Sequence, residues 1–258
     1  MYSREYQEEM LYQLSRVGRP IVGRIGAVER LETLDSRVWT VFFAEYPDYQ
    51  GVVPESEGGV DSVLFGAMVG QETLVIIKGI DDETGTVACS RKETVEKAYP
   101  RVIERIQPDQ IIEAVVVAVV TRDERPVLVV DVGQGVLCEI PRSKASVRYT
   151  MRMREQYRPG QVVQAKVMSV DPLELSIRAA RPDPWQRAVF KNRSLISGTV
   201  YKVDDHLVFV EPDLAPGILG LAPVPLMGDV SRGMRVSCRV RNFDPANRKL
   251  HLRLVNRL

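Results

Sequence analysis

Three stretches of the chain can be laid over one another without gaps: GQETLVIIKGID at residues 70–81, GQVVQAKVMSVD at 160–171 and GMRVSCRVRNFD at 233–244. Each begins at a glycine and passes through alternating apolar residues to an aspartate eleven positions later. This pattern is typical of one long strand between two turns. A shorter strand ending in a basic residue follows each aspartate. The repeat therefore predicts three β-hairpins.

Three further strands are predicted upstream of each hairpin. The first of them opens as GRIGAV at Gly23, AVVVAV at Ala114 and GTVYKV at Gly198. The third closes in Pro54, Pro141 and Pro223, because proline has no amide hydrogen to donate to a strand ladder. Five strands per unit, with a segment of variable length between the third and the fourth, are the layout of an oligonucleotide-binding (OB) barrel.

The predicted fold is all-β, with three tandem five-stranded OB barrels, an N-terminal helix and short helical connectors. The domains are predicted at residues 1–17 for the helix, 18–106 and 107–192 for two barrels with their connectors, and 193–258 for the third barrel. The connectors at 92–106 and 182–193 carry apolar residues at helical spacing. Pro100 is expected to kink or restart the first of these helices.

Charge is distributed unevenly along a chain whose net charge is only +1. Residues 1–100 hold 10 Lys and Arg against 17 Asp and Glu, whereas residues 101–258 hold 25 against 17. This asymmetry favours an anionic partner for the later barrels, although a solvated surface could produce the same totals. No apolar stretch is long enough to span a membrane, and no export signal is visible. A cytoplasmic protein is expected.

Catalysis is not expected, because the chain has no phosphate-binding loop, zinc-protease motif or nucleophile elbow. Only two histidines, His206 and His251, are present. The three cysteines, Cys89, Cys138 and Cys238, lie too far apart in sequence for the close pairing of a zinc or redox motif. They are interpreted as reduced core residues. We predict neither a cofactor nor a metal site.

With these residues in hand, the chain from about residue 18 onward resembles the S1 family of RNA-binding barrels. Its second unit carries the clearest family ending, in which Gly160–Val167 leads to Asp171 and then to Leu175-Ser176-Ile177-Arg178. Asp183-Pro184-Trp185 is similar to the D-P-W that often follows such repeats. Proline replaces the histidine of the family's G-L-V-H turn in all three units, as in the proline-bearing repeats of the family.

The resemblance implies RNA binding through aromatic residues of the second strand and nearby basic residues. In the first unit Trp39 and Phe42 match the two phenylalanines of the family's F-G-A-F motif, and His206 and Phe209 repeat this spacing in the third. The second unit has Pro126 and Val129 instead. Strand alternation places Trp39 and Phe42 on opposite faces, so burial in a barrel core is the alternative for each aromatic residue.

Basic residues are expected to contact the phosphates. Lys92, Arg178 and Arg253 end the last strands of the three units. The most basic stretch of the chain lies in the second unit and contains Arg142, Lys144, Arg148, Arg152 and Arg154 with tyrosines interleaved. Arginines among aromatic residues suit RNA. A solvated cap over a barrel end is the alternative.

The predicted function is non-catalytic binding of single-stranded RNA, in messenger RNA handling or translation. A protein-binding adaptor that docks on a ribosome, polymerase or other nucleoprotein assembly is the alternative. A nuclease or helicase accessory subunit is a third alternative.

Overall fold

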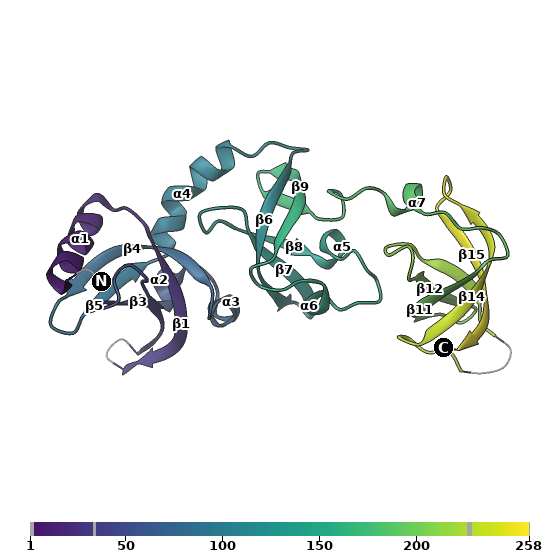
Figure 1. Ribbon diagram of the computed structural model, residues 1–258, viewed down its shortest axis with the longest axis horizontal. Helices are drawn as coiled ribbons and strands as arrows, with labels where there is room; N and C mark the ends of the chain where they lie inside the picture. Colours follow the sequence, from purple (N-terminus) through teal and green to yellow (C-terminus); the bar gives the residue numbers. More distant parts are fainter. Residues whose placement is uncertain (1–2, 33–34, 226–228, 258) are drawn as a thin grey trace. The chain divides into compact units, whose positions relative to one another are not determined.

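The structure is a computed structural model that describes residues 3–32, 35–225 and 229–257 (Figure 1). The chain divides into two compact units, of which the first comprises Met1–Arg142 and Tyr157–Ser176. The second comprises Ser143–Gln156 and Ile177–Leu258. Within the described ranges, no helix has the length and apolar character needed to cross a membrane.

The first sheet is a closed five-stranded barrel with strand order β1-β2-β3-β5-β4. Its strands are β1 (Ile21–Leu31), β2 (Ser36–Phe42), β3 (Gln50–Pro54), β4 (Glu72–Asp81) and β5 (Thr86–Ser90). A parallel pairing of β3 with β5 closes the barrel, with Gly51 opposite Val87. Two short helices, α2 (Glu55–Gly58) and α3 (Ser62–Ala67), connect β3 to β4.

Two longer helices accompany this barrel. The helix α1 (Arg4–Val17) begins after Ser3, whose side chain accepts the Tyr6 N–H. Leu11 of α1 belongs to the barrel core, and the Ser15 hydroxyl donates to the Ile77 carbonyl at 3.4 Å. The helix α4 (Lys92–Glu104) runs through Pro100, so the expected restart at this residue does not occur.

The second sheet has five strands in the order β10-β9-β6-β7-β8. They are β6 (Ile111–Arg122), β7 (Arg125–Asp131), β8 (Leu137–Pro141), β9 (Val162–Val170) and β10 (Leu173–Ser176). Here β8 and the four-residue β10 are the two edges. The single-turn helices α5 (Arg142–Ala145) and α6 (Met153–Gln156) lie between β8 and β9 in the chain.

The third sheet is again a closed barrel, with strand order β11-β12-β13-β15-β14. Its strands are β11 (Leu195–Val203), β12 (Leu207–Pro212), β13 (Gly220–Pro223), β14 (Arg235–Asp244) and β15 (Lys249–Arg257). The connector before it forms only one helical turn, α7 (Pro184–Arg187), where a helix over 182–193 was expected. Beyond this turn the connector is not helical: Val189 is 84% exposed, while Phe190 packs into the core of the third barrel against Phe243.

The repeated glycine has the same physical role in all three units. Gly70, Gly160 and Gly233 have φ values of 86°, 79° and 86°, a region that side chains other than glycine rarely adopt. Their N–H groups donate to Ile25, Val116 and Val200, the residues at which a bulge shifts the register of the first strand. The hydrogen bond from the glycine therefore holds the start of each fourth strand beside the bulge of the first strand.

Burial confirms the expectation that the cysteines are core residues, because all three are buried and none of them forms a disulfide in the described structure. Desolvation raises the pKa of the Cys89 thiol to about 12 and that of Cys238 to about 11. Both thiols are therefore protonated at neutral pH and are poor nucleophiles. The three five-stranded units of the predicted OB layout, the N-terminal helix and the short connectors are all present.

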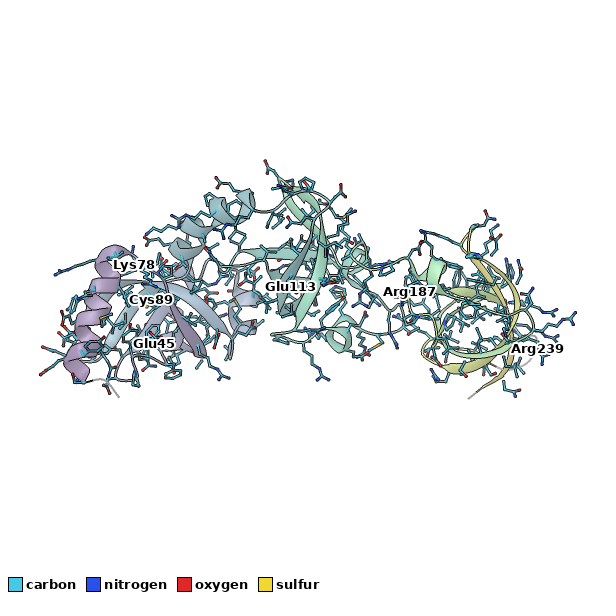
Figure 2. The ribbon with its side chains drawn as sticks, turned by 45° about the horizontal axis from the view of Figure 1, so that its top comes forward. Glu45, Lys78, Cys89, Glu113, Arg187 and Arg239 are labelled. Atoms are coloured by element: carbon cyan, nitrogen blue, oxygen red, sulfur yellow. The ribbon has the colours of Figure 1, made fainter. Side chains whose placement is uncertain are left out.

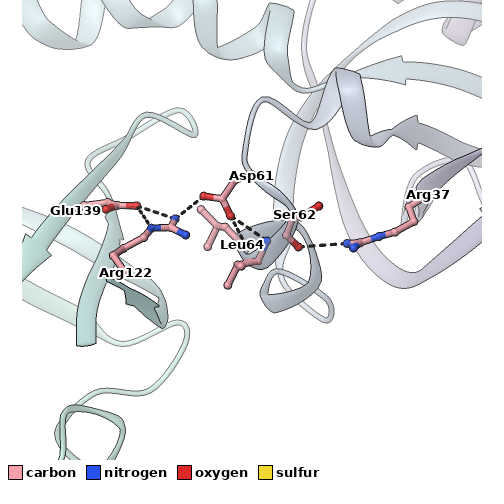
Figure 3. A network of polar contacts seen from close by, with 7 residues as sticks. Arg37, Asp61, Ser62, Leu64, Arg122 and Glu139 are labelled. Carbon is pink, nitrogen blue, oxygen red and sulfur yellow. Dashed lines mark hydrogen bonds and ion pairs between the residues drawn. The ribbon is translucent and has the colours of Figure 1, made fainter. Parts of the chain in front are cut away.

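Polar contacts join the first and second sheets within the first unit (Figure 3). The carboxylate of Asp61 accepts the Val63 and Leu64 N–H groups at the start of α3, at 2.9 and 3.0 Å. Its other oxygen forms an ion pair with Arg122 of β6, whose guanidinium also contacts Glu139 at 2.8 Å. Asp61 therefore serves both as a helix cap and as an inter-sheet contact.

Candidate nucleic-acid interface

The outer face of the third barrel presents an aromatic ring among basic groups. Phe209 lies on β12 between the buried Val208 and Val210, so its ring points outward. Its cross-strand partners are Lys202 on β11 and Leu221 on β13. The Lys202 ammonium lies 5.9 Å from the centre of the Phe209 ring. Since directly paired residues share a face, these three side chains form one patch.

The patch continues onto β15, because Leu221 pairs with His251 in the parallel β13–β15 ladder. Two residues further on, Arg253 is exposed and lies directly opposite Arg239 of β14, which Figure 2 shows on the outside of the barrel. Neither arginine forms an ion pair with any residue in the described part of the chain. Like charges placed opposite each other repel, so a bound anion would relieve this repulsion. We call the outer face the outward-pointing residues that this ladder of pairs links across all five strands: Lys202, Phe209, Leu221, His251, Arg239 and Arg253.

His206 lies beside this face, in the turn before β12, and its side chain is exposed. Phe209 is only half-exposed, which leaves part of the ring accessible to a base. Lys202, Leu221 and His251 were not predicted from the sequence as contact residues. A bulge between Val200 and Lys202 sets the register that brings Lys202 opposite Phe209, and strict alternation does not predict it.

The structure corrects the expectation for Trp39. Its side chain is 0% exposed and stacks on Phe65, with ring centroids 4.1 Å apart and planes 6° from parallel. The indole N–H donates to the Phe65 carbonyl at 2.8 Å. Because α3 covers it, Trp39 is a core residue and no base can stack on it in this structure.

Phe42 is 54% exposed and remains a candidate of the first barrel. Its ring lies over Gly26, where an added Cβ would come within 2.2 Å of a ring carbon. Lys92 is exposed at the start of α4. Arg91, just before it, is 1% exposed and donates to the Gly58 and Gly135 carbonyls. Of the two basic residues that end this unit, only Lys92 is therefore open to a phosphate.

The basic stretch of the second unit is divided by the fold. Arg142 and Lys144 are half-buried, whereas Arg148, Arg152 and Arg154 are exposed. Residues 143–156, which carry four of these five, belong to the compact unit of the third barrel. Arg178 is exposed and donates to the Ser143 carbonyl at 3.3 Å and to the Tyr149 hydroxyl at 3.0 Å. The sequence assigned this stretch to the second barrel alone.

Comparison with curated proteins finds the small ribosomal subunit protein bS1 of several Staphylococcus aureus strains, among them COL, N315 and MW2. The match is 25% identical over 224 residues and covers 79% of this chain and 55% of the relative. The chain is a distant homologue of ribosomal protein bS1. It spans about half the length of the bS1 proteins that it matches. The resemblance to S1 repeats is thereby confirmed.

Other comparisons add less than the likeness to bS1. No family model matches the chain. A multidomain protein with nucleic acid binding domains from Streptococcus pneumoniae TIGR4 covers 92% of this chain, and 73% of its own, at 15% identity and a TM-score of 0.25. The match to Drosophila Unr CSD456 covers 93% of this chain and 97% of that protein, at 11% identity and a TM-score of 0.23. At these scores neither likeness bears on function.

Proposed function

We propose that the chain binds single-stranded RNA without catalysing a reaction on it, and that the outer face of the third barrel is a principal contact. The observation that carries this proposal is the Phe209 ring beside Lys202, on a barrel whose exterior also carries Arg239 and Arg253, two arginines without an ion pair to any described residue. Single strands are held by cations along the backbone and by rings on which bases stack, each stacked base contributing about 1–3 kcal/mol.

Distant homology to bS1 supports nucleic-acid binding as the general activity. The finer assignment, to messenger RNA handling or translation with attachment to a ribosome or another nucleoprotein assembly, is part of the proposal. Arg148, Arg152, Arg154 and Arg178 add exposed positive charge to the same compact unit. We expect these residues to contact phosphates without reading bases.

The first barrel favours a second candidate function, docking on a protein. Residues 1–100 are acidic, and burial of Trp39 leaves Phe42 as the ring of β2 that is open to a base. This barrel is therefore poorly equipped for a polyanion. A protein contact through it is compatible with RNA binding by the third barrel.

Fluorescence anisotropy with the full chain tests the proposal. Labelled single-stranded RNA, duplex RNA and single-stranded DNA would be titrated at two salt concentrations. We expect single strands to bind more tightly than the duplex, and the affinity for them to fall with salt as counterions are released. Failure to bind single-stranded RNA even at low salt would overturn the proposal and favour the adaptor function.

A double variant, Arg239→Gln with Arg253→Gln, tests the outer face. If each arginine neutralises one phosphate, the slope of log affinity against log salt becomes less negative by about 1.4, at about 0.7 per contact for single strands. Arg101→Gln with Arg105→Gln removes the same charge from exposed positions of the first unit and is the matched control. Equal slopes for the two double variants would exclude the face as the main phosphate contact.

A further inference from the structure

A buried carboxylate of the third barrel anchors segment 143–156, which precedes β9 in the chain. Glu211 of β12 is 4% exposed. One oxygen accepts the Tyr149 N–H at 3.0 Å and the Gly217 N–H at 2.9 Å. The other accepts the Thr150 N–H at 2.8 Å and the Thr150 hydroxyl at 2.6 Å.

These four donors make Glu211 a specific anchor. A carboxylate has about four lone-pair sites, and here each oxygen accepts two hydrogen bonds. Glu211 has no ion pair with any described residue, so its charge depends on these donors. Burying a charge without hydrogen bonds is costly, and the backbone of Tyr149 and Thr150 is therefore held firmly against β12.

The anchor brings two tyrosines and two arginines together. The Tyr149 ring lies beside that of Tyr201 on β11, with centroids 5.4 Å apart and planes tilted by 57°. The Arg178 guanidinium lies 5.4 Å from the Tyr149 ring, and that of Arg232 lies 5.9 Å from the Tyr201 ring. We call the series Arg178, Tyr149, Tyr201 and Arg232 the tyrosine ladder.

The ladder has the composition of a single-strand contact. Both arginines are exposed, both rings are half-exposed, and neither arginine has an ion pair with the residues described here. The two adjacent rings can stack on bases, and the guanidinium groups on either side of them can contact phosphates. Tyr201 is the extra residue of the bulge between Val200 and Lys202. Tyr201 is half-exposed and Lys202 is exposed, whereas Val200 is buried, so the ladder adjoins the outer face at this bulge.

We propose that the tyrosine ladder is a second contact for the same single-stranded RNA, extending the path that begins at Phe209. It rests on the proposed function, because it takes further nucleotides of a strand already held by the outer face. Glu211 is its positioning residue. The ladder contributes only when the RNA is long enough to pass beyond the outer face.

The experiment compares two labelled RNAs, of about 4 and about 16 nucleotides, the limits of the usual site size of one OB barrel. The full chain and a Tyr149→Ala, Tyr201→Ala double variant would be titrated with both. We expect the variant to bind the short RNA within about twofold of the parent, and the long RNA at least about fivefold more weakly. Tyr6→Ala with Tyr99→Ala removes two rings that are 44% and 45% exposed in the first unit, and is the control.

Two further variants keep the test decisive if the alanine variant does not fold. Arg178→Gln with Arg232→Gln leaves both rings in place and should weaken only the long RNA, with a smaller salt dependence. Glu211→Gln should also weaken only the long RNA, and should speed amide hydrogen exchange in residues 143–156. Its amide nitrogen cannot accept the hydrogen bonds that one carboxylate oxygen now accepts.

The outcomes separate this inference from the proposed function. If the parent binds neither RNA, the proposed function fails and the ladder has no role in it. If the parent binds both RNAs and the folded ladder variants bind them equally well, the outer face stands and the ladder is overturned, which leaves it as a surface for a protein. If the ladder variants lost the same affinity for the short and the long RNA, the inference would also be overturned. Such a result would mean that the substitutions disturb the barrel and do not remove a separate contact.

Discussion

Trp39 and Phe42 lie three residues apart on β2, yet one is a core residue and the other is exposed. The Trp39 indole fills the space between the barrel and Phe65, and its N–H satisfies the Phe65 carbonyl. A match to an aromatic motif therefore does not establish a stacking role. At Trp39, tertiary packing decides whether the ring is a core residue or a stacking surface.

Trp39→Phe should reduce stability without changing RNA affinity. The smaller ring leaves the buried Phe65 carbonyl without its donor, which costs about 1–3 kcal/mol, and lost packing adds to this. Urea unfolding measures the first effect and RNA titration the second. Phe42→Leu, at an exposed position, should cost less and is the stability control. A folded Trp39→Phe variant with several-fold weaker RNA binding would contradict the burial argument.

At the scale of the element, Asp61 supports helix α3 and also reaches β6. Burial by itself would raise the pKa of Asp61, but hydrogen bonds from the Leu64 N–H and from Arg122 outweigh it and leave the pKa below its ordinary value. A carboxyl whose folded pKa is lowered contributes stability above its unfolded pKa. This contribution is lost as the pH falls through the folded value.

Asp61→Ala should destabilise the chain more than Asp61→Asn. Asparagine can still cap α3, whereas alanine removes a cap contributing about 0.5–2 kcal/mol. The Arg122 ion pair, at an exposed position, contributes no more than about 1 kcal/mol. Urea unfolding at neutral pH measures both losses. The difference between parent and Asp61→Asn should shrink below about pH 4, and a difference independent of pH would exclude the charge as its cause.

For the whole molecule, we propose that the third barrel begins near residue 193, as predicted from the repeat. The preceding connector is exposed at Arg187, which Figure 2 labels, and at Lys191 and Arg193. Exposed loops of this kind are preferred sites of proteolysis. Paired strands such as β9 and β10 are protected by their hydrogen bonds.

Limited trypsin digestion should therefore cut first at one or more of these three residues. The exposed Arg181 should resist, because Pro182 follows it. Mass spectrometry of the early fragments identifies the cuts. Early cleavage at Lys166 of β9, while the connector stays intact, would contradict the proposed boundary.

The strand pattern of this protein could be predicted from its sequence. Alternation, the aspartate turns and the closing prolines are local signals, and three copies of them made the five-stranded unit recognisable. The physical reason for the repeat is clearest at Gly70, Gly160 and Gly233, because the backbone has a positive φ at each of them. The exposed positions of Phe42, His206 and Arg253 could also be expected from alternation and turns.

Tertiary structure decided which of these residues share a surface. Tyr149 and Glu211 are 62 positions apart in the chain, yet the carboxylate anchors a segment that the sequence assigned to the second barrel. Lys202 reaches Phe209 only through a bulge, and α3 turns Trp39 from a surface candidate into a core residue. Periodicity reports which side of a strand is apolar, because that depends on neighbours along the chain. Which elements cover that side depends on contacts between distant residues, which no local pattern encodes.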